Sequence, residues 1–154
     1  MNTTRKRYLD DLVIGTPASS GPYTVQLQEM LDFARRYDPQ YFHTEPVAAR
    51  ASIFGEVVAS GLYTAVVWRR LDHEISGDVA WICGISWKEV AWPRPMRAKD
   101  VVRARVEYLS KRLSGSDPKR GVVEVRYALV NEREEHLFSC LSINLVETAP
   151  ACCS

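Results

Sequence analysis

The chain has 154 residues, of which 46% are hydrophobic and 25% are charged, a composition typical of an ordinary domain that buries its own core. We therefore expect a single domain over residues 1–154, with flexible tails at 1–7 and 148–154. The 20 basic and 19 acidic residues leave a net charge of +1, which argues against nucleic acid or an anionic membrane surface as the partner. No apolar run has the length of a membrane span or a signal peptide, so a cytoplasmic location is expected.

The first periodic segment runs from Thr24 to Tyr37. Its apolar residues recur at helical spacing, which predicts an amphipathic helix with Thr24 as the N-cap. Pro39 disfavours helical backbone in the residue before it, so the helix should end there and leave Asp38 on a loop. A short helical piece is expected over residues 45–51.

The stretch from Ser60 to Trp68 is apolar on nearly every face. This pattern predicts a helix that is buried all round. Ser60 is the expected N-cap, and Gly61 in the first turn would leave its backbone N–H open to whatever lies above it.

The second half of the chain changes to a period of two, which predicts strands. Gly84 in the first strand indicates a bulge or a close approach, and a polar turn is expected over 131–135. The last strand continues the pattern with Leu137, Ser139, Leu141, Ile143 and Leu145 on one face. The sequence thus favours an α+β class with a curved antiparallel sheet wrapped around the apolar helix, its strands falling at 79–90, 102–108, 123–129 and 137–145.

Candidate catalytic residues are few. Of the three histidines, His73 and His136 lie beside charged residues and are expected to be solvated, whereas His43 follows Asp38 by five positions. A histidine can move protons near neutral pH, and an aspartate can orient it or share a water with it. By spacing alone, a helix-end Asp38 and a surface His43 are the commoner interpretation. The four cysteines lack the spacing of metal ligands, and no metal site is expected.

The longer segment from Phe33 to Thr64 favours a functional role for Asp38 and His43. In it an Asp, four residues and then a His are followed, after an interval, by an apolar stretch that ends in Gly61. The string resembles the MaoC-like dehydratase family of hot-dog-fold (R)-specific enoyl-CoA hydratases, and the similarity extends to residues 8–12, 112–121 and 130–132. The resemblance implies a curved sheet around a long central helix, and a homodimer formed by joining two sheets edge to edge.

The resemblance also implies an activity. In the family the Asp and the His hold the catalytic water and the glycine N–H stabilises the thioester oxygen, which assigns Asp38, His43 and Gly61 as catalytic residues. The implied reaction is the reversible syn addition of water to a trans-2-enoyl thioester, of coenzyme A or an acyl carrier protein, to give a (3R)-hydroxyacyl thioester. No cofactor is implied beyond the coenzyme A or phosphopantetheine of the substrate itself.

Two positions depart from the family pattern and are candidates for substrate binding. Tyr41 lies between the Asp and the His, where the hydratase signature often has Asn-Pro, and Ser60 replaces a frequent His; for Ser60, capping is the favoured interpretation. Several aromatic residues could line an acyl tunnel, although core packing is the commoner role: Tyr63, Trp68, Trp81, Trp87 and Trp92. The alternatives are a hot-dog thioesterase, and a non-catalytic acyl-binding protein or structural subunit of a heterodimer.

Overall fold

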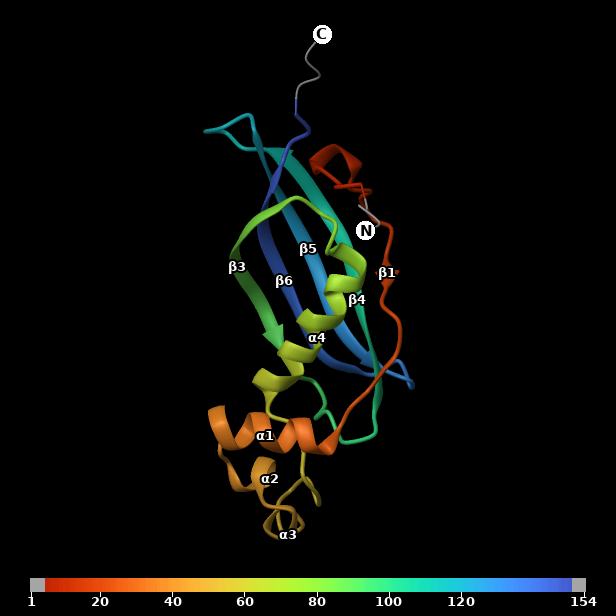
Figure 1. The fold of residues 1–154 in the computed structure, drawn as a ribbon, viewed down its shortest axis with the longest axis vertical. Helices are drawn as coiled ribbons and strands as arrows, with labels where there is room; N and C mark the ends of the chain where they lie inside the picture. Colours follow the sequence, from red (N-terminus) through yellow and green to blue (C-terminus); the bar gives the residue numbers. More distant parts are fainter. Residues whose placement is uncertain (1–4, 151–154) are drawn as a thin grey trace.

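The computed structural model describes residues 5–150. Its first half holds the short elements η1 (Leu9–Asp11), β1 (Ala18–Ser19) and β2 (Tyr23–Thr24), and the helices α1 (Leu27–Tyr37), α2 (Tyr41–Thr44), α3 (Pro46–Ala49) and α4 (Gly61–Ser76). Four long strands follow: β3 (Trp81–Ala91), β4 (Val101–Leu113), β5 (Arg120–Asn131) and β6 (His136–Glu147). Helix α4 lies against one face of the sheet, and α1, α2 and α3 gather at one end of it (Figure 1). The predicted α+β class is confirmed.

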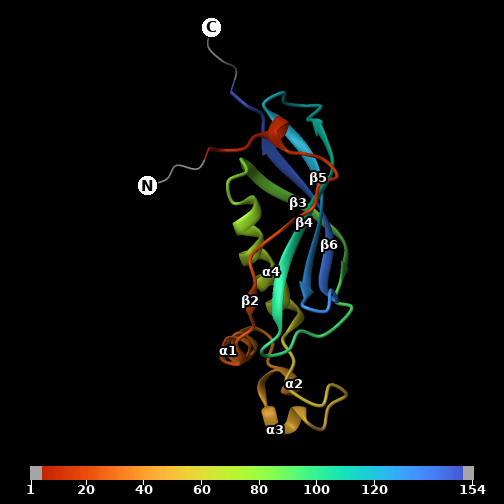
Figure 2. The same ribbon diagram turned by 90° about the vertical axis from the view of Figure 1, so that its right-hand side faces the viewer.

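The strands form one antiparallel sheet in the order β1-β4-β5-β6-β3, and β2 also pairs with β4. Strands β4, β5 and β6 are a meander, as the alternating pattern predicts. Figure 2 shows the curvature of this sheet, with α4 on its concave side. The predicted polar turn joins β5 to β6, where the Asn131 side-chain oxygen accepts the N–H groups of Arg133 and Glu135. Strand β3 is at the edge of the sheet.

The core lies between α4 and the sheet. Trp68 on α4 is fully buried, and its ring centroid is 4.8 Å from that of Tyr127 on β5 and 5.1 Å from that of Phe138 on β6. The parity predicted for β4 and β5 is confirmed, because the buried residues alternate with more exposed ones from Val102 to Tyr108 and from Val123 to Tyr127. These side chains form the face that supports α4.

In β6 the face predicted to be buried is wrong over residues 141–145. Leu141, Ile143 and Leu145 are only partly buried, whereas Ser142 and Asn144 are buried on the side that faces α4. The register explains the inversion. Val125 pairs with Ser142 and Val123 with Asn144, after a shift between Leu129 and Val130, and paired residues of neighbouring strands share a face.

Two helix predictions also need correction. Helix α1 begins at Leu27 after the N-cap Gln26, because Thr24 pairs with Val101 as part of β2 and is not available as a cap. Helix α4 continues to Ser76, and it is not buried all round, since Leu62 and Val66 are 57% and 50% exposed. One side of α4 therefore faces away from the core.

Residues near both ends of the described chain form hydrogen bonds, and the flexibility expected of 1–7 and 148–154 stays a prediction. Arg7 donates to both carboxylate oxygens of Asp78, at 2.8 and 2.6 Å, and the Thr148 N–H donates to the Lys119 carbonyl. Residues 1–4 and 151–154 lie outside the described part of the chain. Over residues 5–150, no helix combines the length and the apolarity needed to cross a bilayer.

Candidate active site

Asp38 and His43 lie beside the beginning of α4, on two short segments that Pro39 separates. Asp38 is the C-cap of α1, where its N–H still donates to the Ala34 carbonyl at 2.8 Å while its own backbone is no longer helical. This is the break that Pro39 predicts. His43 lies in α2, a single helical turn that begins two residues after the proline.

The two side chains converge without touching. The Nε2 atom of His43 is 3.7 Å from the Oδ2 atom of Asp38, which is longer than a hydrogen bond but short enough for one water to contact both atoms. The other ring nitrogen, Nδ1, is 2.7 Å from the Val58 carbonyl oxygen. A carbonyl only accepts, so Nδ1 carries the hydrogen and Nε2 of the neutral ring is an acceptor. Both atoms of the pair therefore offer lone pairs to a water.

Ser60 connects this pair to the helix. Its hydroxyl donates to Asp38 Oδ2 at 2.6 Å and accepts the Leu62 N–H at 3.2 Å, so the predicted N-cap is confirmed. The side chain is fully buried. One hydroxyl thus caps α4 and orients the carboxylate, while Oδ2 keeps a second lone pair that can accept a hydrogen from a water.

Gly61 occupies the first position of α4, where an α-helix provides no acceptor for a backbone N–H. Among residues 5–150, no carbonyl or side chain accepts this N–H. The indole N–H of Trp92 donates to the Gly61 carbonyl at 2.8 Å, and a Cβ on Gly61 would lie 3.2 Å from the same indole nitrogen. The absence of a side chain at Gly61 therefore gives Trp92 room to lie across the helix end.

Trp92 was not predicted as a site residue. In the sequence it is an aromatic residue at the end of a strand, a pattern that does not distinguish a core tryptophan from one at a site. Its position depends on a contact between residues 31 positions apart.

A polar brace holds α1 against α4 and so keeps Asp38 near Ser60. Glu29 on α1 accepts the Tyr63 hydroxyl of α4 at 2.9 Å and also the Tyr23 hydroxyl of β2. These hydrogen bonds, Tyr23 first, lower the pKa of the Glu29 carboxyl. The Phe33 and Tyr63 rings pack beside the brace, with centroids 5.3 Å apart. Tyr63, which from the sequence was expected either in the core or in the wall of an acyl tunnel, is therefore a positioning residue.

Tyr41 is the predicted site residue that the structure does not bring into this arrangement. It is the first residue of α2, 49% exposed, and its ring packs edge-on against Phe42. Among the described residues, no hydrogen bond joins its hydroxyl to Asp38 or Gly61. Its role in substrate binding stays a prediction.

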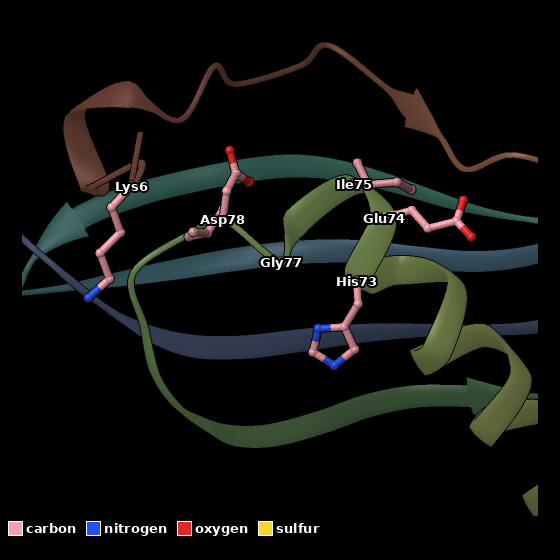
Figure 3. Close-up of a pocket in the computed structure, with 7 residues that line it drawn as sticks. Lys6, His73, Glu74, Ile75, Gly77 and Asp78 are labelled. Carbon is pink, nitrogen blue, oxygen red and sulfur yellow. The ribbon is translucent and has the colours of Figure 1, made fainter. Parts of the chain in front are cut away.

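The opposite end of α4 carries a cavity of about 650 Å³ that does not involve these residues. Figure 3 shows Lys6 and His73 projecting to the same side there, with Gly77 between them. Exposed His73 thus lies at the far end of the helix from His43. Within residues 5–150, no group of three or more potential ligands is arranged to hold a metal ion.

Comparison with known proteins places this geometry in a family. Residues 12–132 match the model of the MaoC-like domain. The chain belongs to the MaoC-like domain family. A MaoC-like dehydratase from Rhodospirillum rubrum superposes with a TM-score of 0.84 at 29% identity, over 94% of this chain and 99% of that one.

More distant structural neighbours identify the fold. A conserved hypothetical protein from Mycobacterium tuberculosis, described as a double hot-dog fold, matches with a TM-score of 0.79 at 14% identity, over 95% of this chain and 46% of that one. The (R)-hydratase PhaJ1 of Pseudomonas aeruginosa matches with a TM-score of 0.72 at 14% identity, over 92% of this chain and 86% of that one. The hot-dog fold expected from the sequence is confirmed.

Proposed function

We propose that this MaoC-like protein is an acyl hydratase or dehydratase that adds water reversibly to a trans-2-enoyl thioester. The observation that carries the proposal is the pair of acceptors, Asp38 Oδ2 and His43 Nε2, 3.7 Å apart beside a helix-end N–H at Gly61. The likeness in fold to an (R)-hydratase supports it. The product would be a (3R)-hydroxyacyl thioester, of coenzyme A or of an acyl carrier protein.

In this proposal the water lies between the two acceptors. It donates one hydrogen to the Asp38 carboxylate and one to His43 Nε2, which directs an oxygen lone pair at the β-carbon of the substrate. The C–O bond forms as one O–H bond of the water breaks, the Asp38/His43 pair takes up the released proton, and the pair returns a proton to the α-carbon on the same face. Addition therefore consumes one water and leaves the pair ready for another cycle. Dehydration runs through the same steps in reverse.

The Gly61 N–H would receive the thioester oxygen. Negative charge develops on that oxygen as the β-carbon is attacked, and a preorganised donor at the positive end of a helix dipole stabilises it. α4 has 16 residues, and its first N–H has no acceptor within the described chain. Both requirements for such a donor are thus present at Gly61.

Ser60 and Tyr41 take different roles in this scheme. Ser60 is fully buried and its hydroxyl is engaged with Asp38 and Leu62, so we assign it to orienting Asp38 rather than to contact with the substrate. The half-exposed Tyr41 remains a candidate for contact with the carrier or the acyl group.

We also propose that the protein is a homodimer joined at β3. Within the described chain β3 pairs only with β6, and an open edge is a template for a further strand. Ile82, Ile85 and Val90 on this strand are 41%, 54% and 37% exposed, which provides apolar surface for a second copy.

The test is an assay of crotonyl-CoA hydration. The loss of absorbance of the conjugated thioester measures the rate. The wild-type protein should be active, and Asp38→Asn and His43→Ala should each lower kcat by about two powers of ten or more. Asp32→Asn on the same helix and His73→Ala at the far end of α4 are matched controls, both at exposed positions, and should leave the rate unchanged. An active parent whose rate survives the changes at Asp38 and His43 would remove this pair from the mechanism.

Release of free thiol must be measured in the same assay. A thioesterase would liberate coenzyme A without forming a hydroxyacyl thioester, and that result would replace a hydratase with a hydrolase at the same site. A folded wild-type protein that binds crotonyl-CoA and does neither would instead be a non-catalytic acyl-binding protein.

A further inference from the structure

Strand β3 has an irregularity close to its end. Lys88 and Ala91 pair with β6 residues that are only two positions apart, so three steps along β3 correspond to two steps along β6. One extra residue is thus inserted between these pairs, which is a β-bulge. Glu89, inside the bulge, has a φ of 52°, a left-handed conformation that is uncommon for residues other than glycine. Bulges often re-aim a side chain next to an active site.

The bulge decides which face of the sheet Trp92, directly after β3, occupies. Side chains alternate between the two faces of a strand, and Trp87 is on the face that α4 covers, where its ring packs against Trp68 at 5.5 Å. Regular alternation from Trp87 would turn residue 92 to the outer face, away from α4. With the extra residue Trp92 lies on the inner face, and its ring centroid is 5.7 Å from that of the buried Phe138. The bulge therefore brings Trp92 to α4.

The five-membered ring of Trp92 lies against the first residue of α4. Its Nε1–H donates to the Gly61 carbonyl at 2.8 Å, and a Cβ on Gly61 would lie 3.2 Å from Nε1 and 3.3 Å from Cε2. Trp92 is nevertheless 45% exposed. An indole combines a large apolar surface with one N–H donor, and here the donor fixes the ring while much of the surface stays open. Open aromatic surface thus lies next to the helix-end N–H.

Trp92 and Asp38 lie on different sides of the start of α4. The Ser60 hydroxyl reaches Asp38, whereas the direction in which a Cβ of Gly61 would point leads to Trp92. Consecutive residues direct their side chains to different sides, both in a helix and in an extended segment. The pair that holds the water and the indole therefore flank the Gly61 N–H.

This arrangement fixes how a thioester would lie. The carbonyl carbon of a thioester is trigonal, so its α-carbon and its sulfur diverge on opposite sides of the C=O bond. If the oxygen accepts the Gly61 N–H and the β-carbon faces the water at Asp38, the α-carbon is on the side of Asp38. The sulfur is then directed away from Asp38, towards the side on which Trp92 lies.

We propose that Trp92 is a substrate-binding residue whose indole packs against the thioester sulfur and the first carbons of the pantetheine arm. The inference rests on the proposed function, because it places the thioester oxygen at Gly61. Sulfur packs favourably against aromatic rings, and a rigid indole loses little conformational freedom on binding. This part of the substrate is common to all acyl-CoA and acyl carrier thioesters, so the contact secures the thioester without selecting the acyl chain.

Binding of saturated thioesters tests this contact separately from catalysis, since these compounds cannot be hydrated. Acetyl-CoA, butyryl-CoA and octanoyl-CoA would be titrated by calorimetry against the wild type, Trp92→Leu and Trp92→Phe. We expect Trp92→Leu to weaken the binding of all three compounds by a similar factor, about fivefold, and Trp92→Phe, which keeps an aromatic ring, to weaken it by about twofold.

Trp87→Leu is the matched control. Trp87 is on the same strand and the same face as Trp92 and is 51% exposed, but its ring packs against Trp68, about two turns along α4 from Gly61. Affinity for the three compounds should stay within about twofold of the wild type. Urea unfolding of each variant checks that the protein is folded, because loss of either indole removes packing.

A second pair of variants alters the bulge without changing Trp92 itself. Glu89 is exposed, and its left-handed backbone suits glycine but opposes the β-branched valine, which favours a regular strand. Glu89→Gly should therefore bind all three compounds like the wild type. Glu89→Val should weaken their binding about as much as Trp92→Leu, because a strand without the bulge turns residue 92 to the outer face.

Three results would overturn the inference. They are wild-type affinity in Trp92→Leu, an equal loss of affinity in Trp87→Leu, and a loss confined to octanoyl-CoA, which would place the acyl chain rather than the sulfur against the ring. Hydration of crotonyl-CoA is then measured with the same proteins. A uniform loss of affinity in Trp92→Leu with no hydration by the wild type would retain the contact and refute the proposed function. Hydration with an unchanged kcat/KM in Trp92→Leu would do the reverse.

Discussion

The Ser60 hydroxyl donates to Asp38 Oδ2 at 2.6 Å and at the same time accepts the Leu62 N–H, so the residue that caps α4 also orients the carboxylate at the end of α1. The two functions can be separated experimentally. Replacement of an N-cap serine by glycine costs only a few tenths of a kcal/mol, whereas alanine costs about 1 kcal/mol. Neither residue has a hydroxyl that could reach Asp38.

We therefore expect Ser60→Ala and Ser60→Gly to lower the rate of crotonyl-CoA hydration to a similar extent, about tenfold. Urea unfolding should show Ser60→Ala to be the less stable of the two. If the glycine variant kept the wild-type rate, the hydroxyl would act on the helix alone.

Gly61→Ala should impair activity with little effect on folding. The new methyl group would lie 3.2 Å from the Trp92 indole nitrogen, and because Trp92 is 45% exposed its ring can move aside. We expect the free energy of unfolding to change by less than about 0.5 kcal/mol and turnover to fall at least about tenfold. In a Trp92→Leu background, Gly61→Ala should lower turnover by a smaller factor. If the losses of the two changes were fully additive, displacement of Trp92 would not be the cause of the loss in Gly61→Ala.

Asp72→Asn should stabilise the protein at neutral pH. Burial raises the pKa of the Asp72 carboxyl, so its protonated form is favoured in the folded state, and the contribution of this group to stability is full below the ordinary value of 3.8 and is lost as the pH rises. The stability difference between the variant and the wild type should therefore be larger at pH 7 than at pH 4, measured by urea unfolding. The opposite trend would mean that the ion pair with Arg69 outweighs the cost of burial.

Gly121→Ala should destabilise the protein by about 1–3 kcal/mol, because a Cβ there would lie only 2.8 Å from Cγ of the buried Leu9. Leu9→Ala in the same chain should recover part of that loss, since it removes the overlapping atoms. Gly115→Ala is the control, because a Cβ at that position meets no atom within 4 Å. A similar loss in Gly115→Ala would point to backbone effects rather than overpacking.

Ile85→Lys should shift the protein towards the monomer, because it places a charge on the open edge of β3. Sedimentation velocity of wild type and variant at equal concentration measures this shift. Ile53→Lys is the control, since Ile53 is 96% exposed in the loop before α4 and lies far along the chain from β3. Unchanged sedimentation of Ile85→Lys relative to wild type would place any dimer contact elsewhere.

Much of the fold could be predicted from the sequence because it depends on local backbone physics. Pro39 ends α1 through a clash with its neighbour, and Ser60 caps α4. Alternation over Val102–Tyr108 and Val123–Tyr127 marks the buried faces of β4 and β5. The approach of His43 to Asp38 was inferred only from the resemblance to a family. Their separation of 3.7 Å depends on how α1 and α2 pack at the start of α4.

The sequence by itself determined the order of the two main helices and the four long strands, the broken helix at Asp38 and the cap at Ser60. Only the tertiary structure decided which face of β6 is buried, because a shift at Leu129 sets the pairing and thereby turns Ser142 and Asn144 towards α4. The physical reason is the distance along the chain over which each feature is determined. Caps and helix breaks depend on the neighbouring residues, whereas a β-register that slips by one position exchanges the two faces of a strand and is set by contacts far along the chain.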